Sequence, residues 1–308
     1  MSDHTIRRFL NSSAACGCLL AAAATALPTA PHEPASAPSG PLAPGSERLR
    51  DAPLSLSAMQ DGDEPAPAEE INTGQDPTRP LTRIDVRLKH IDLPGGFETQ
   101  LLTLRADKPF VLDGGWQLST RVDLPLILTD VPGPDNPDGG HEFGMADSLV
   151  QGLLITPPLD AGKRWVVAFG TQLLFPTGSQ DQMGTGKWQL APTLAVRAGL
   201  PEISPGSFFA LLVRDQFSFA GDDDRRDIND LVVQPVLNFQ LPHTWFITLS
   251  PEMRFNLEDD GDAFIPFDVL VGTMIRPGVV GSVQLDVPIV DDYEQYDWQI
   301  EFRIGFFF

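Results

Sequence analysis

The sequence predicts an all-β fold, namely a transmembrane up-and-down antiparallel β-barrel of about 12 strands that follows a disordered N-terminal extension. Three observations predict it. Apolar and polar residues alternate along residues 81–308, turn signals divide that stretch into an even number of segments, and the connections alternate between two kinds. An even number of strands returns the end of the barrel to the side on which it begins.

Residues 1–26 have the pattern of an export signal. A basic pair precedes a short apolar run that ends in an Ala-x-Ala motif, and cleavage as late as residue 30 also fits. The run is shorter than the roughly 20 apolar residues of a membrane-spanning helix. Cys16 and Cys18 both lie here, so the mature chain is expected to have no disulfide, zinc site or thiol nucleophile. Lipidation of Cys16 stays open, although the leucine of a lipobox is missing.

Residues 27–80 read as an acidic, disordered linker rich in proline and alanine. Residues 31–80 contain ten prolines and no aromatic residue, so they cannot bury enough apolar surface to offset their conformational entropy. A tether to another envelope component is the functional alternative. The net charge of −21 over the whole chain argues against a nucleic-acid partner.

The alternation is clearest in the last strand, YDWQIEFRIGFFF. One face carries apolar side chains and the other polar ones, which suits a wall between lipid and water. The segments WFITLSPEMRFN and WQLSTRVDLPL repeat the pattern. In the last strand the apolar face holds Trp298, Ile300, Phe302, Ile304, Phe306 and Phe308, and the polar face holds Gln299, Glu301, Arg303 and Gly305.

Turn signals place about twelve strands along residues 81–308. Their lengths suit outer-membrane strands of about 9 to 11 residues with their loops. Connections after odd-numbered strands are mostly long and acidic or glycine-rich, as in TDVPGPDNPDGGHE, whereas those after even-numbered strands are mostly short, as in RPG. The expected strands begin near residues 81, 97, 115, 143, 163, 187, 205, 228, 243, 263, 279 and 296.

All five tryptophans fall at the start of expected strands, on the apolar face. Tryptophan prefers the membrane interface, where its ring is half buried and its N–H stays wet. A soluble sandwich would more naturally place them in mid-strand. We therefore expect an interface girdle of Trp116, Trp165, Trp188, Trp245 and Trp298.

Several phrases are similar to a known family. The runs LLFPTGSQDQMGTGKWQLAPTLAV and VVQPVLNFQLPHTWFITLSPE, with RVDLPL and FGMADSLVQGLLITP before them, resemble the outer-membrane β-barrel family named for a component of the meta-pathway of phenol degradation. The resemblance spans residues 81–308 and implies a Gram-negative outer-membrane barrel, often described as a transporter. The name hints at aromatic substrates. Phe308, on its aromatic strand, resembles the C-terminal signal that barrel-assembly machinery reads.

The polar face is expected to line the lumen with nearly balanced charge. One interpretation is a constriction that selects small solutes, and the other is that paired charges fill the lumen. The pairs Arg121 with Asp123 and Glu252 with Arg254 share a face and are the first to test. The lumen candidates are Arg121, Asp123, Asp147, Arg197, Glu252, Arg254, Asp268, Asp286, Glu301 and Arg303.

The tetrapeptide Gly-Thr-Gly-Lys at residues 184–187 invites comparison with a phosphate-binding loop. Asp181 stands where such a loop needs glycine, and Trp188 stands where it needs serine or threonine. We expect instead a hairpin loop at the outer rim, with Lys187 next to lipid headgroup phosphate.

The function that these features predict is an outer-membrane channel or transporter for small, aromatic or hydrophobic molecules. The alternatives are a non-conducting structural barrel and a lipid-modifying enzyme, but no serine partner is evident for His90 or His141, so no catalytic residue is expected. The acidic loops lack the order of a calcium loop, and neither a metal nor a cofactor is expected. Outer-membrane lipid and lipopolysaccharide are the expected surroundings, with both termini periplasmic.

Overall fold

A computed structural model describes residues 72–134, 136–293 and 295–308. The predicted signal peptide, Cys16 and the linker up to residue 71 lie outside the described residues. Within the described ranges, no helix is both long and apolar enough to cross a membrane.

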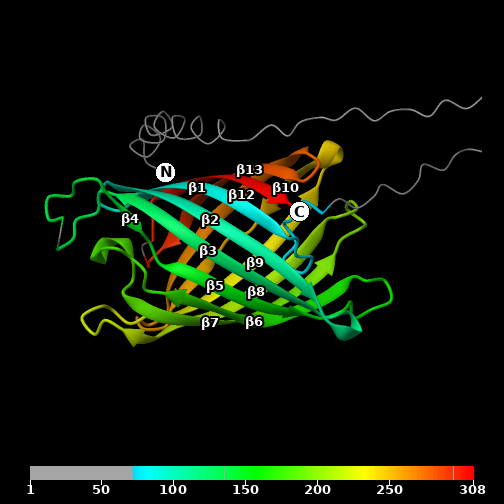
Figure 1. Ribbon diagram of the computed structural model, residues 1–308, viewed down its shortest axis with the longest axis horizontal. Helices are drawn as coiled ribbons and strands as arrows, with labels where there is room; N and C mark the ends of the chain where they lie inside the picture. Colours follow the sequence, from blue (N-terminus) through cyan, green and yellow to red (C-terminus); the bar gives the residue numbers. More distant parts are fainter. Residues whose placement is uncertain (1–71, 135, 294) are drawn as a thin grey trace, which may run out of the picture. The chain divides into compact units, whose positions relative to one another are not determined.

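Every strand of the described residues belongs to one antiparallel sheet (Figure 1). Three short 3-10 turns, Asp113–Gly115, Asp181–Met183 and Pro242–Thr244, lie between strands. The strands are β1 (Arg83–Leu93), β2 (Phe97–Val111), β3 (Gln117–Thr129), β4 (Glu142–Met145), β5 (Ser148–Ile155), β6 (Trp165–Phe175), β7 (Lys187–Gly199), β8 (Phe208–Gly221), β9 (Asn229–Gln240), β10 (Trp245–Leu249), β11 (Met253–Asn256), β12 (Asp262–Arg276), β13 (Val279–Asp291) and β14 (Trp298–Phe307).

These fourteen segments make a closed barrel of twelve strands. β4 and β5 pair with successive parts of β3, and β10 and β11 both lie between β9 and β12, so each pair forms one interrupted strand. β1 pairs with β14 from Arg83 opposite Phe307 to Asp92 opposite Trp298, which closes the sheet. The predicted fold class and strand number are confirmed.

The alternation predicted from sequence decides which side chains face outward. On β3, Val122 and Leu124 are exposed on the outer surface, whereas Ser119 and Asp123 between and beside them are buried inside. Successive side chains of a strand point to opposite faces, so a period-two sequence gives a barrel with an apolar exterior and a polar interior.

The connections lie on two rims. The loop rim carries residues 94–96, 130–134, 136–141, 176–186, 222–228, 257–261, 292–293 and 295–297. The terminal rim carries residues 112–116, 156–164, 200–207, 241–244 and 277–278. Figure 1 shows the long 130–141 loop at the left end of the barrel. Phe308 also lies at the terminal rim, where its N–H donates to the carbonyl of Thr82 at 3.0 Å. The tightest turn there uses Gly278, whose φ of +78° favours glycine.

The strand that contains β10 and β11 is interrupted at Ser250–Glu252. Pro251 in the gap has no N–H to donate to a ladder. Side chains form hydrogen bonds with the backbone of Ser250 instead. Its N–H donates to Oδ1 of Asp268 at 3.1 Å, and its carbonyl accepts from Nε2 of Gln234 at 3.3 Å. Both backbone polar groups of Ser250 are therefore hydrogen-bonded at the break.

Residues 72–82 pack inside the terminal end of the barrel. The sequence assigns residues up to 80 to the linker, but Asp76 is buried there and pairs with Arg197 of β7 at 3.0 Å. The carbonyl of Gly74 accepts from Nη1 of Arg83 at 2.8 Å. A stretch with few apolar residues can order itself in this way because the polar lumen supplies charged partners. Residue 81 is thus not where ordered contacts begin.

Candidate functional site

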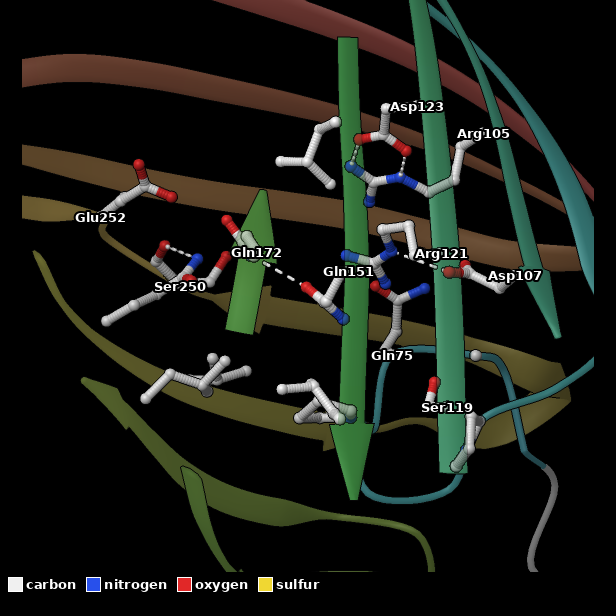
Figure 2. Close-up of a pocket in the computed structure, with 18 of the residues that line it drawn as sticks. Gln75, Arg105, Asp107, Ser119, Arg121, Asp123, Gln151, Gln172, Ser250 and Glu252 are labelled. Atoms are coloured by element: carbon white, nitrogen blue, oxygen red, sulfur yellow. Dashed lines mark hydrogen bonds and ion pairs between the residues drawn. The ribbon is translucent and has the colours of Figure 1, made fainter. Parts of the chain in front are cut away.

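The barrel encloses a cavity of about 440 Å³. All twelve strands contribute inward side chains to its lining, and residues 74–81 of the N-terminal segment border it as well. Figure 2 shows charged side chains of β2 and β3 beside amide side chains of β5 and β6 in the lining of this space. The size lies within the range of about 300 to 1,000 Å³ typical of small-molecule pockets.

A ladder of ion pairs covers the wall of β1, β2 and β3. Asp107 lies directly between Arg83 of β1 and Arg121 of β3 in the register of the sheet, and each guanidinium donates to it through Nε at 2.7 Å. One rung further on, Arg105 pairs with Asp123 through two hydrogen bonds of 2.7 and 2.5 Å. Such bidentate pairs fix both side chains in one geometry.

A second cluster centres on Glu301 of β14. Its carboxylate accepts from Arg303 at 2.9 Å and lies 3.6 Å from Arg87 and 3.9 Å from Lys89. Arg87 and Arg303 are directly opposite each other across β1 and β14, an arrangement of like charges that would be destabilising alone. Glu301 offsets this repulsion because it lies close to both.

A third cluster lies at the break in the opposite wall. Glu252 accepts from Arg214 of β8 and from Arg254 of β11, each at 2.6 Å. Arg254 also reaches Asp230 of β9 at 3.3 Å. In all three clusters one carboxylate serves at least two cationic groups.

The wall of β5 and β6 is less charged. Gln151 and Gln172 are directly opposite each other, and Nε2 of Gln172 donates to Oε1 of Gln151 at 2.8 Å (Figure 2). Leu149 and Leu174 form the neighbouring cross-strand pair, and both line the cavity. The lumen therefore combines a charged wall with a wall of amides and leucines.

The ten lumen candidates from the sequence divide into two groups. Arg121 and Asp123 do pair with charged groups, but each with a residue of β2 rather than with each other, whereas Glu252 does pair with Arg254. The cavity is lined by Arg121, Asp123, Glu252, Arg254, Glu301 and Arg303, while Asp147, Arg197, Asp268 and Asp286 lie elsewhere.

The other four candidates make contacts that position neighbouring segments of the barrel. Arg197 binds Asp76 of the N-terminal segment. Asp268 and Asp286 are buried and directly opposite each other on β12 and β13, and Asp268 accepts from Ser250 at the wall break. Asp147, at the gap between β4 and β5, organises the 176–186 loop.

Asp147 explains the conformation of the Gly-Thr-Gly-Lys stretch. Its Oδ2 accepts from the N–H and from the hydroxyl of Thr185, both at 2.7 Å, and its Oδ1 accepts from the N–H of Gly178 at 3.1 Å. The stretch is thus a carboxylate-bound hairpin loop. Within the stretch, the backbone N–H groups of Thr185 and Lys187 donate to groups of the protein itself, Asp147 and the Thr185 hydroxyl.

The expected position of Lys187 is wrong. Its side chain is buried, with 5 % of its residue surface exposed, and Nζ forms an ion pair with Asp227 at 2.8 Å. Residues 187 and 188 point to opposite faces of β7, so the exposed Trp188 leaves Lys187 on the inner side. The hydrogen bond from Lys187 lowers the pKa of the Asp227 carboxyl below its usual range.

Three of the five tryptophans are exposed on the outer surface, namely Trp165 (47 %), Trp188 (37 %) and Trp245 (48 %). Trp116 is half-buried beside Phe169, in an edge-to-face contact with ring centroids 6.4 Å apart. Trp116, Trp165 and Trp245 lie at the terminal rim, and Trp188 at the loop rim.

Trp298, also at the loop rim, differs from the others. Only 3 % of it is exposed, and Nε1 donates to Oδ2 of Asp92 at 2.7 Å. Its ring lies 5.0 Å from that of His90. This tryptophan links β14 to β1 at the closure of the barrel.

At the terminal rim, Asp160 organises the connection between β5 and β6. Its Oδ1 accepts the N–H groups of Trp165 and Arg164, each at 2.8 Å. These hydrogen bonds, that from Trp165 foremost, lower the pKa of the Asp160 carboxyl. Throughout the described ranges, no group of three or more histidine, cysteine or acidic residues could hold a metal ion.

Sequence reasoning missed three residues of the site. Asp107 was detectable, because it follows Arg105 by two residues and so shares its inward face. Asp76 and Gln151 gave no such signal. Asp76 belongs to a proline-rich stretch, and its composition does not predict that the stretch enters the lumen. Gln151 is a glutamine on the polar face of a strand, a position where glutamine is common.

A comparison with family models finds a match within the barrel. Residues 93–206, from the end of β1 through β7, match the family described as "Putative MetA-pathway of phenol degradation". Over this segment, which is less than half of the chain, the chain is similar to that family. The resemblance seen in the quoted phrases is thereby confirmed over residues 93–206.

The fold is shared with a solved outer-membrane channel. The COG4313 outer membrane channel from Pseudomonas putida F1 is 16 % identical, with a TM-score of 0.61 over 78 % of this chain and 100 % of the channel. The NanC porin (12 % identity, TM-score 0.49, 73 % and 98 % of the two chains) and the KdgM porin (12 %, 0.44, 73 % and 99 %) are more distant. A comparison with curated proteins finds no match.

Proposed function

We propose that the protein is an outer-membrane channel for small molecules, with the terminal rim on the periplasmic side. The observation that carries this proposal is the polar, charged cavity of about 440 Å³ inside a closed wall whose outer face is apolar. Such a wall can span a bilayer without an open edge. The fold shared with the COG4313 outer membrane channel supports the same function.

The N-terminal segment 72–82 is the proposed regulator of passage. It borders the cavity from the terminal rim and is held by the ion pair of Asp76 with Arg197 and by the hydrogen bond from Arg83 to Gly74. These polar contacts can be exchanged for water when the segment leaves. The lumen would then widen at that end.

The surroundings proposed for the barrel follow from its surface. Exposed apolar side chains and the rim tryptophans suit outer-membrane lipid, with lipopolysaccharide at the loop rim. Phe308, at the end of the strand that closes the barrel, is the proposed contact with the barrel-assembly machinery.

Conductance in planar bilayers tests the proposal. The wild-type protein should give discrete openings, and Asp76→Asn should increase the open probability several-fold because it removes the charge that holds the segment. Glu202→Gln, which alters an exposed ion pair with Arg164 at the terminal rim, should behave as wild type. If neither the wild type nor Asp76→Asn conducts, the non-conducting structural barrel is correct.

The alternative of a lipid-modifying enzyme has less support. Nδ1 of His90 is hydrogen-bonded to the side-chain amide of Gln100, and the ring packs against Trp298. These are the contacts of a structural histidine at the closure of the barrel. A catalytic histidine would need a nucleophile within hydrogen-bond reach.

A further inference from the structure

The lumen has a local excess of positive charge. Among the described residues that line the cavity, nine are basic and five are acidic, an excess of four positive charges in a chain with a net charge of −21. The excess arises in part because one carboxylate in each of the three clusters, namely Asp107, Glu301 or Glu252, is shared between at least two cations. An anionic solute would therefore be favoured inside the lumen although the molecule as a whole repels anions.

Arg121 is among the more exposed of these cations. Its Nε is bound to Asp107, but Asp107 also accepts from Arg83, so one carboxylate serves two guanidinium groups. No hydrogen bond from the terminal nitrogens of Arg121 to any other described residue is found, and 25 % of its side chain is exposed to the cavity. A guanidinium edge with two free nitrogens matches the two oxygens of a carboxylate.

A second donor lies next to Arg121. Gln151 is directly opposite Arg121 in the register of β3 and β5. The Oε1 of Gln151 is occupied by the amide of Gln172, which leaves the Nε2 amide of Gln151 to donate into the cavity. Figure 2 shows the side chains of Arg121 and Gln151 close together at this point.

An apolar surface continues from these donors. Leu149 and Leu153 lie on either side of Gln151 on the inner face of β5, and Leu174 is opposite Leu149 on β6. An apolar group that follows a carboxylate could cover these leucines. A dianion such as phosphate fits less well, because Asp107 and Asp123 already place negative charge near Arg121.

We infer that Arg121 and Gln151 form a binding subsite for small organic monocarboxylates, with Leu149, Leu153 and Leu174 receiving the apolar body of the solute. The inference rests on the proposed function, since it names the class of solute that the channel would pass. Benzoate is a suitable probe because it joins a carboxylate to an aromatic ring. Benzamide has the same shape without the charge.

Isothermal titration calorimetry on the purified full-length protein in detergent tests the subsite. Benzoate should bind at least about tenfold more tightly than benzamide, and Arg121→Gln should weaken benzoate binding by at least about tenfold, the equivalent of roughly 1.4 kcal/mol. Arg164→Gln, which removes an exposed arginine at the terminal rim, is the matched control and should leave the affinity unchanged.

Equal affinities for benzoate and benzamide, or no effect of Arg121→Gln, would overturn the subsite. If Arg121→Gln fails to fold, Gln151→Leu decides: it leaves the ion pairs intact and should weaken benzoate binding about threefold, and an unchanged affinity overturns the inference. Benzoate binding without conductance would refute the channel but not the subsite. Conductance without benzoate binding would refute the subsite alone.

Discussion

At the scale of single residues, shared carboxylates determine how the lumen is filled. Asp107 binds two arginines of two different neighbouring strands, and Glu301 and Glu252 likewise serve several cations each. Buried charges are tolerated only when they are paired. Because each of these three carboxylates has several partners, removal of one should destabilise the barrel more than removal of one of the basic groups.

Asp107→Ala should therefore destabilise the barrel by about 2 to 3 kcal/mol. Exposed ion pairs contribute about 1 kcal/mol or less, whereas breaking a buried pair costs about 3 to 5 kcal/mol. Only 5 % of the Asp107 side chain is exposed, although the lumen around Arg121 is partly open. The midpoint of urea unfolding in lipid vesicles measures the effect.

Glu202→Ala provides the comparison for Asp107→Ala. Glu202 also pairs with an arginine, but 62 % of its side chain is exposed, so the expected loss is less than about 1 kcal/mol. Equal losses for the two variants would show that pairing in the lumen adds nothing to stability.

At the scale of elements, two interrupted strands depend on acidic side chains. Asp268 satisfies the backbone at the break between β10 and β11, and Asp147 binds the 176–186 loop beside the break between β4 and β5. Both breaks leave backbone groups without a ladder partner, and such groups are costly in a buried wall. Side-chain acceptors replace the missing ladder there.

Asp147→Ala should loosen the 176–186 loop without unfolding the barrel. The substitution removes three accepted hydrogen bonds, two from Thr185 and one from Gly178, and bonds to a charged group contribute about 1.5 to 3 kcal/mol each. Amide hydrogen exchange of Thr185 should accelerate at least about tenfold, while exchange in β1 stays unchanged. Unaltered exchange at Thr185 would contradict this role of Asp147.

At the scale of the whole molecule, closure joins the first strand to the last. β1 pairs with β14 along ten residue positions, and Phe308 continues the contact by donating to Thr82. A barrel without this pairing would expose two sheet edges, which lipid does not tolerate. Closure therefore leaves neither β1 nor β14 as an open sheet edge.

Deletion of Phe308 should lower the amount of barrel assembled in the outer membrane several-fold. The reason is the loss of the terminal aromatic residue that resembles an assembly signal, together with its hydrogen bond to Thr82. The fraction of protein whose gel mobility shifts on heating measures the folded barrel. An unchanged fraction would show that β14 is recognised without Phe308.

The strands themselves were largely predictable, and the ion pairs were not. The expected start near residue 187 coincides with the first residue of β7, and the expected start near 279 coincides with that of β13. Alternation is a local property, so the sequence of each strand predicts which of its side chains point into the lumen and which point outward. Which residue lies opposite Arg121 depends on the register between strands, and the sequence of one strand does not contain that information.

The sequence by itself determined the closed barrel, its twelve strands and the polar nature of its lumen, because side-chain direction in a strand follows from position along the chain. Only the tertiary structure decided that Arg121 pairs with Asp107, that Asp147 holds a loop, and that residues 72–82 lie inside the barrel. Those contacts join segments distant in sequence, and the closing of the sheet is what brings them together.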